Sequence, residues 1–261
     1  MISLKSNPLN KKYKALILDI DGTIVEGYAG IPSKKVKNAI EKASKKIHIG
    51  LATSRPIFFL SDILDNIKLS GPSILSGGCQ IVDFPSQKVL WEKTVSFNDM
   101  KNVYDLVKTL GVELLVLDSD KGVGEKDIPF SEKSPPKRPL HLWIHEISSS
   151  LTDQIITKIS HIPTIAIYRI PSWSKVNEDI IITHAQATKQ HGIFEVAKLL
   201  GINTHEIIGV GDGYNDLPLL MACGLKVAMG NAVPDLKAIA DYVAPSVAED
   251  GVADVIEKFI L

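Results

Sequence analysis

The chain of 261 residues is 45% hydrophobic and 23% charged, and its 29 basic and 30 acidic side chains give a formal net charge of −1. This balance excludes the strongly basic surface that nucleic acid demands, so we expect no nucleic-acid partner. An anionic substrate would have to be attracted by a local cluster of residues rather than by the field of the whole protein.

The sequence also bears on the compartment in which the protein works. The first 14 residues carry lysines but no apolar segment of a signal peptide, and no apolar run approaches the roughly 18 residues that cross a bilayer. Cys79 and Cys223 are far apart, and we interpret them as free thiols in a reducing compartment. We therefore expect a cytoplasmic protein without a membrane partner, and the sequence assigns no oligomeric state.

The N-terminal part alternates strands and helices. Residues 15–20 are apolar at consecutive positions, which is typical of a strand covered on both faces of a parallel sheet. Ser33 is a plausible N-cap for the helix that follows. The expected elements, in chain order, are a strand at 15–20, a helix at 34–46, a strand at 47–54, a helix at 58–68 and a strand at 73–78.

The middle of the chain has a different pattern. Residues 81–93 predict a β-hairpin with Pro85 and Ser86 in its turn. A proline-bearing polar stretch at 124–139 predicts a loop. The other expected elements are helices at 97–111 and 150–160 and strands at 112–119, 140–147, 164–170 and 178–185. This order predicts an inserted α+β domain with an antiparallel sheet, which we place at residues 83–182.

The alternating pattern returns after this insert. A helix is expected at 189–201 with Gly201 as its cap. It is followed by strands within 205–213 and 226–230 and by helices within 215–225, 232–242 and 250–260. Residues 1–82 and 183–261 are therefore expected to form one α/β domain with a doubly wound parallel sheet.

Two aspartates follow the first strand. Ligands of open α/β sheets bind beyond the carboxyl ends of the strands, where Asp19 and Asp21 lie. Residues two apart share one face of a strand, so the two carboxylates can converge on one ligand, one as a nucleophile and the other as an acid or base. An Asp-Gly turn with an incidental second aspartate is the structural alternative.

A second carboxylate pair, Asp212 and Asp216, follows the apolar strand near the C-terminus. If the two strands are neighbours, the two pairs form an oxygen-rich site suited to Mg²⁺. Asn215 or Asp216 would also serve as a helix cap.

Two further segments offer groups that bind phosphate. Thr53 and Ser54 end the second strand and present hydroxyls and backbone donors, and Arg55 follows them at the expected substrate mouth. Lys189 opens a helix. A lone lysine is usually a solvated surface residue, and a serine at this place is often only a helix cap.

Together these segments resemble the haloacid dehalogenase-like hydrolase superfamily. Its four motifs match Asp19 to Thr23, Thr53, Lys189 and Gly211 to Asp216, in that order, and the resemblance covers the chain from about residue 14 to the end. The insert between the second and third motifs is similar to the cap of the Cof-type, or type IIB, branch. The branch usually has Thr-Gly-Arg where this chain has Thr-Ser-Arg, and often Asn-Gly-Ala where this chain has Gly77-Gly78-Cys79.

The resemblance implies a role for each matched residue. Asp19 would become the aspartyl-phosphate, and Asp21 would act as general acid and then as general base. Mg²⁺ would be held by the side chains of Asp19 and Asp212 and by the backbone carbonyl of Asp21. Asp216 and Asn215 would support the metal site from outside its ligands, and Thr53, Ser54 and Lys189 would hold the phosphoryl group.

The expected function is therefore the Mg²⁺-dependent hydrolysis of a small phosphorylated metabolite, such as a sugar phosphate. One alternative is a phosphomutase, which would need a bisphosphate activator and release little phosphate. Another is a non-catalytic phosphate-binding regulator, which would not require both Asp21 and Lys189. The sequence does not identify the substrate or the cap residues that select it.

Overall fold

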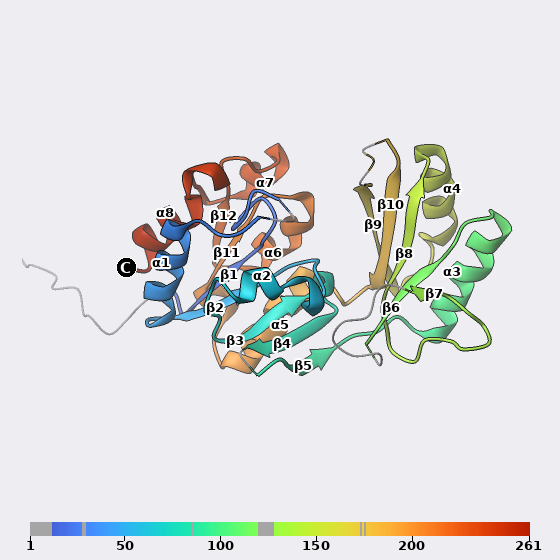
Figure 1. The fold of residues 1–261 in the computed structure, drawn as a ribbon, viewed down its shortest axis with the longest axis horizontal. Helices are drawn as coiled ribbons and strands as arrows, with labels where there is room; N and C mark the ends of the chain where they lie inside the picture. Colours follow the sequence, from blue (N-terminus) through green and yellow to red (C-terminus); the bar gives the residue numbers. More distant parts are fainter. Residues whose placement is uncertain (1–11, 28–29, 85, 120–127, 173, 175) are drawn as a thin grey trace, which may run out of the picture.

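The computed structural model describes residues 12–27, 30–84, 86–119, 128–172, 174 and 176–261. Its first lobe is built on a parallel sheet in the order β13-β12-β11-β1-β2 (Figure 1). The strands are β1 (Ala15–Leu18), β2 (His48–Leu51), β11 (Ile207–Gly211), β12 (Leu225–Ala228) and β13 (Tyr242–Val243). β1 pairs with both β2 and β11, which places the two aspartate-bearing segments on adjacent strands.

Helices cover this sheet. They are α1 (Lys34–Ser44), α5 (Lys189–Leu200), α6 (Leu217–Ala222), α7 (Pro234–Ile239) and α8 (Gly251–Phe259). Ser33 caps α1, since its side chain accepts the N–H of Val36 at 3.1 Å. Gly201 ends α5 with a φ of 66°, a left-handed conformation that glycine adopts without strain. These observations and the parallel sheet confirm the predicted α/β fold.

A separate antiparallel sheet continues the edge next to β2. It contains β3 (Gly71–Leu75), β4 (Gln80–Phe84) and β5 (Lys88–Glu92). β3 meets the end of β2 through one isolated parallel bridge, Ala52 with Ile74. Along the rest of β2, serine side chains take part in the connection: Ser73 Oγ accepts the N–H of Leu51 at 3.0 Å, and Ser70 Oγ accepts that of Ile49 at 3.3 Å, while the N–H of Ser70 donates to the carbonyl of Ile49 at 3.2 Å. β3 therefore carries its carboxyl end beside that of β2.

The second lobe is an antiparallel sheet in the order β7-β6-β8-β10-β9. Its strands are β6 (Leu115–Asp118), β7 (Ile128–Pro129), β8 (Pro139–Ile147), β9 (Ile165–Pro171) and β10 (Glu178–His184). The helices α3 (Phe97–Thr109) and α4 (Ser149–Ile159) lie on the face turned away from the first lobe (Figure 1). This is the α+β insert that the sequence predicts. Of the loop expected at 124–139, residues 124–127 lie outside the described residues, and Ile128–Pro129 form β7 rather than a loop.

Two details differ from the sequence analysis. The hairpin β4–β5, expected within an insert of residues 83–182, pairs with β3, and Phe84 packs in the core of the first lobe. We therefore propose that the insert begins after β5. The helix expected at 58–68 is reduced to the 3₁₀ turn η1 (Ile57–Phe59) and to α2 (Ser61–Leu64). The amide of Asn66 donates to the carbonyl of Asp62 at 2.6 Å and so competes with continuation of the helix.

Within the part of the chain that the structure describes, none of the helices is both long and apolar enough to cross a membrane.

Candidate active site

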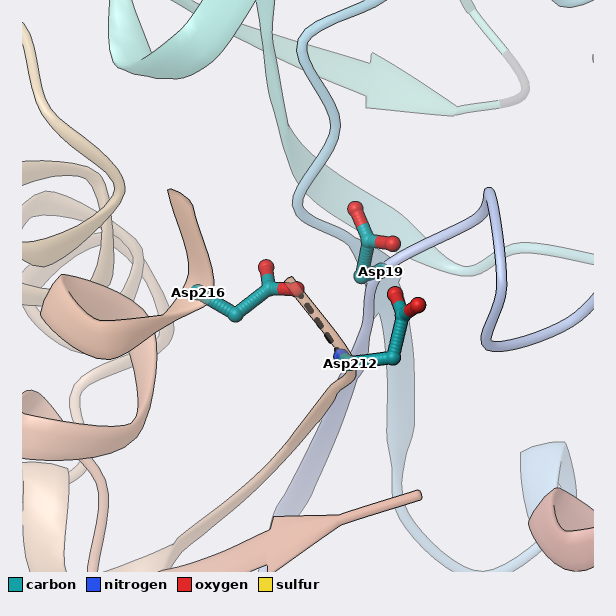
Figure 2. Close-up of side chains that lie close together, drawn as sticks. All are labelled: Asp19, Asp212 and Asp216. Carbon is teal, nitrogen blue, oxygen red and sulfur yellow. Dashed lines mark hydrogen bonds between the residues drawn. The ribbon is translucent and has the colours of Figure 1, made fainter. Parts of the chain in front are cut away.

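The carboxyl ends of β1 and β11 bring three aspartates together. Asp19 follows β1 and Asp212 follows β11, and the N–H of Asp19 donates to the carbonyl of Val210 at 3.0 Å, which aligns the two strand ends. Asp216 lies in the 3₁₀ turn η5 (Tyr214–Asp216) that follows Asp212. One carboxylate oxygen from each of the three lies within 4.8 Å of those of the others (Figure 2). The side chains of Asp19 and Asp216 are almost completely buried, with 7% and 0% exposure.

Lys189 lies between two of these carboxylates. Its Nζ is 2.7 Å from Asp19 Oδ1 and 2.6 Å from Asp216 Oδ1, and its side chain is 2% exposed. Lys189 is the first residue of α5, whose N-cap Thr188 accepts the N–H of His191. The helix therefore begins at the site. Lys189 is buried there and is not a solvated surface lysine, which was the alternative interpretation of the sequence.

Asp216 also shapes the loop after β11. Its Oδ2 accepts the N–H groups of Asp212 and Gly213, each at 3.0 Å, and Figure 2 shows the first of these bonds. Because Oδ1 is bonded to Lys189, both oxygens of Asp216 already have partners in the protein. Asp216 therefore fixes the position of Asp212 and Lys189. The bonds that Asp212 accepts, 3.5 Å from the hydroxyl of Thr23 and 3.3 Å from the side-chain amide of Asn231, are longer, so its carboxylate is better placed than that of Asp216 to accept a ligand.

Burial, together with neighbouring charges, shifts the pKa of Asp19, Asp212 and Lys189. Burial, reinforced by the charge of Asp216 and opposed by Lys189, raises the pKa of Asp19 to about 8. Burial and Asp216 also raise the pKa of Asp212 to about 6. For Lys189, burial lowers the pKa, but Asp19 and Asp216 outweigh it and the pKa is raised overall, so the amine remains charged. When the three carboxylates are ionised, one lysine offsets only one of their charges.

This donor set fits a hard divalent cation. Its ligand atoms are carboxylate oxygens, as Mg²⁺ prefers. A bound cation would relieve the repulsion that, in addition to burial, raises the pKa of Asp19 and Asp212. Glycine at position 22 also leaves room for the carboxylate of Asp212, because a β-carbon on Gly22 would lie 2.1 Å from Asp212 Oδ2. The residues present therefore fit the expected metal.

The expected phosphate-binding segment lies one strand away, at the end of β2. Thr53 is buried, and its Oγ1 accepts the N–H of Arg55 at 3.1 Å, which leaves the hydroxyl proton available to a ligand. Ser54 Oγ accepts a hydrogen bond from the side-chain amide of Asn215 at 3.3 Å. This bond joins the loop after β2 to the loop after β11, so the sequence-predicted residues Ser54 and Asn215 lie beside each other.

Arg55 differs from its expected place at an open substrate mouth. The residue is only 6% exposed, and its Nε donates to Asp21 Oδ2 at 3.0 Å while Nη2 bonds Asp21 Oδ1. The Asp21 side chain is 40% exposed. The guanidinium therefore faces the carboxylate of the expected acid and base.

Sequence reasoning missed Asn231. Its side-chain amide donates to the carbonyl of Gly22 at 2.8 Å and to Asp212 Oδ2 at 3.3 Å, and so links the two aspartate-bearing loops. A signal was present, because Asn231 shortly follows β12, the next strand along the edge that carries the other site residues.

Comparisons with known proteins identify the family of the chain. The family model for haloacid dehalogenase-like hydrolases matches residues 16–256, and the chain belongs to this family. YxeH of Bacillus subtilis is 27% identical over 95% of this chain and 99% of its own length. The 5-amino-6-(5-phospho-D-ribitylamino)uracil phosphatase YcsE of the same organism is 23% identical over 95% of this chain and 96% of its own.

Among solved structures, the subclass IIB sugar phosphatase BT4131 superposes with a TM-score of 0.75 and 26% identity, covering 94% of this chain and 98% of that chain. The resemblance inferred from the motifs is confirmed.

Proposed function

We propose that this protein is a Mg²⁺-dependent phosphatase of small phosphomonoesters, and that it works through a phospho-aspartate intermediate on Asp19. The observation that carries the proposal is the placement of Asp19, buried at a strand end between Lys189 and the Asp212 carboxylate, with Asp21 two residues later and partly open to solvent. This arrangement supplies a nucleophile, a source of positive charge and an acid or base around one small volume.

Asp19 is proposed to attack the phosphorus atom. An oxygen–phosphorus bond forms to the carboxylate while the bond between phosphorus and the leaving oxygen breaks. Asp21 gives its proton to that leaving oxygen, and it later accepts a proton from the water that attacks the phospho-aspartate. The second step releases inorganic phosphate and restores the Asp19 carboxylate, so both steps balance without a further reactant.

The phosphoryl oxygens would be held from several sides during transfer. Thr53 offers its hydroxyl proton, Ser54 offers its hydroxyl and backbone N–H, and Lys189 offers a charged amine that is fixed by Asp216. Donors fixed before reaction stabilise developing charge more effectively than solvent that must reorient. The side chains of Asp19 and Asp212 and the backbone carbonyl of Asp21 would hold Mg²⁺, with Asp216 and Asn215 supporting this site from outside the ligands. When bound, Mg²⁺ supplies additional positive charge against the phosphoryl oxygens.

The second lobe supports the proposed substrate class. Ile180 and Ile182 of β10 and Leu142 and Ile144 of β8 pack in the core of that lobe. Since successive strand residues point to opposite faces, Trp143 and Asp179 lie on the other face, which is turned toward the first lobe (Figure 1). A face with aromatic and polar groups suits a compact polar leaving group such as a sugar or polyol. By their names, BT4131 and YcsE act on small phosphorylated molecules of this kind.

The experiment is phosphate release from a panel of sugar phosphates and other small phosphomonoesters, with Mg²⁺ or with a chelator. We expect release that requires Mg²⁺ and that Asp19→Asn abolishes while circular dichroism shows an intact fold. Full activity in the chelator would contradict the role of the metal, and normal turnover by Asp19→Asn would contradict the phospho-aspartate. No release from any ester would overturn the proposed function.

A further inference from the structure

The pairing of Arg55 with Asp21 has a geometry that a residue at an open mouth does not need. Two nitrogens of the guanidinium bond the two oxygens of one carboxylate, an arrangement that fixes the plane of the carboxylate as well as its position. Arg55 is 6% exposed, so little of it faces solvent or an incoming molecule. At the site, the structure thus pairs Arg55 with Asp21, the expected acid and base.

The remaining nitrogen of Arg55 connects this pair to a turn. Nη1 donates to the carbonyl of Phe59 at 3.2 Å, the last residue of η1. The ring of Phe59 lies 4.5 Å from that of its neighbour Phe58. Any shift of this turn therefore moves an acceptor of Arg55, and with it the group that orients Asp21.

Phe58 in turn contacts a small apolar cluster between the two lobes. It packs against Cys79, Leu117, Leu140 and Ala187. Leu117 and Leu140 belong to β6 and β8 of the second lobe, whereas Cys79 lies between β3 and β4 of the first. The thiol of Cys79 donates to the carbonyl of Leu140 at 3.2 Å, which ties the cluster across the lobes. The contacts form a continuous series from Asp21 to the second lobe.

We propose that Arg55 is the positioning residue of Asp21 and that it couples the orientation of this acid and base to the docking of the second lobe through the 57–59 turn. The inference rests on the proposed phosphatase function. To protonate the leaving oxygen, Asp21 must present one carboxyl oxygen that Arg55 does not occupy. One of the two hydrogen bonds between Arg55 and Asp21 therefore breaks as a substrate enters. The other hydrogen bond to Asp21, and the bond from Arg55 to the carbonyl of Phe59, then keep the carboxyl group in line with the leaving oxygen.

Leaving groups of different acidity separate this role from a structural one. The kcat/KM value covers the steps up to departure of the leaving group. An alcohol needs a proton to depart, whereas p-nitrophenol leaves as a stable anion. We expect Arg55→Gln to lower kcat/KM for an alkyl phosphate by about 100-fold or more, within the usual contribution of general acid catalysis. For p-nitrophenyl phosphate the loss should be less than about tenfold.

A double-mutant comparison then tests whether Arg55 acts through Asp21. Arg55→Gln combined with Asp21→Asn should be no slower on the alkyl phosphate than Asp21→Asn alone, because the group that Arg55 orients is already lost. Arg55→Lys should recover only part of the activity, since a lysine cannot form the fork. Equal losses on both esters, or additive losses in the double variant, would overturn the proposal.

The coupling to the second lobe has its own test. Phe58→Ala should reproduce the selective loss on the alkyl phosphate, while Phe97→Ala, which truncates an aromatic residue 50% exposed at the start of α3, should leave both esters unaffected. A Phe58→Ala variant with unchanged selectivity would overturn the coupling. Absence of hydrolysis by the wild-type protein would overturn the proposed function and this inference together, and is thereby distinguished from failure of the inference alone.

Discussion

Gly22 lies so close to the carboxylate of Asp212 that a β-carbon on Gly22 would not fit between them. A β-carbon on Gly22 would lie 2.1 Å from Asp212 Oδ2, and the φ of Gly22 is +82°. A side chain at this position would therefore meet both a steric clash and backbone strain. The clash falls on the carboxylate of Asp212, a residue expected to hold Mg²⁺, and this links a turn residue of the first motif to the metal site.

The first prediction separates these two effects. Gly22→Ala should lower Mg²⁺-dependent activity by about 100-fold, because it displaces Asp212. Gly111→Ala is the matched control: its φ is +70°, but a β-carbon there would meet nothing within 4 Å. Both variants should lose about 1–2 kcal/mol of unfolding free energy from strain, measured by urea denaturation. Equal activity in the two variants would show that the clash has no effect on the site.

A second prediction concerns pH. The pKa of Asp19 is raised from 3.8 to about 8 and that of Asp212 from 3.8 to about 6. The folded protein thus retains protons that the unfolded chain releases, and the stability gained from these groups is lost as pH rises from about 4 to about 8. Mg²⁺ bound at the proposed site would compete with those protons and offset the repulsion between the carboxylates. The increase in Tm on adding Mg²⁺ should therefore be small near about pH 5.5 and larger near about pH 8.

Thermal unfolding in Mg²⁺ or in a chelator, at both pH values, measures this difference. Asp212→Asn should reduce the increase in Tm at the higher pH, since it removes a proposed ligand. The same Mg²⁺-induced increase at both pH values would contradict the protonation argument.

The third prediction concerns the connection between β2 and β3. Ser73 is completely buried, and its hydroxyl accepts the N–H of Leu51. Ser73→Ala would leave this buried N–H without that partner, so we expect a loss of about 1–3 kcal/mol in unfolding free energy. Ser44→Ala, at an exposed hydroxyl bonded to the carbonyl of Glu41, should change stability by less than about 0.5 kcal/mol. Similar urea midpoints for the two variants would contradict this account.

The connection at Ser73 also shows what the sequence could not predict. The apolar run of β1 and its terminal aspartates predict a buried parallel strand with a site at its end, because burial on both faces and strand polarity are local properties. Whether β3 joins the parallel sheet depends on Ser70 and Ser73, whose bonds to β2 are visible only when the strands are placed beside each other. The same limit applied to the hairpin β4–β5, whose pattern predicts a hairpin but not its partner strand.

The site shows a similar division. Spacing predicts that Asp19 and Asp21 converge, but not that Arg55 forms a fork on Asp21, since a solvated arginine has the same local sequence. Lys189 illustrates the reverse case. Its burial between Asp19 and Asp216 comes from contacts across 170 and 27 residues, and only the order of the four motifs suggested it.

The last prediction addresses substrate selection. In the second lobe, Trp143 Nε1 donates to Asp179 Oδ2 at 3.0 Å, and His145 Nδ1 lies 3.1 Å from the same carboxylate. The rings of Trp143 and His145 are 4.7 Å apart. Asp179 is 2% exposed, so a buried carboxylate holds two rings on the face turned toward the first lobe. Fixed rings of this kind can bind the apolar face of a sugar at little entropic cost.

Trp143→Ala should therefore lower kcat/KM for the preferred sugar phosphate by about tenfold, the equivalent of about 1.4 kcal/mol. Acetyl phosphate, whose leaving group is too small to reach the rings, should be hydrolysed almost as well as by the wild type. Asp179→Asn keeps a hydrogen-bonding group beside the rings and should cause a smaller loss with the same selectivity. An equal loss of kcat/KM for both substrates would mean that Trp143 only stabilises the sheet, because a destabilised fold would lower activity regardless of the leaving group.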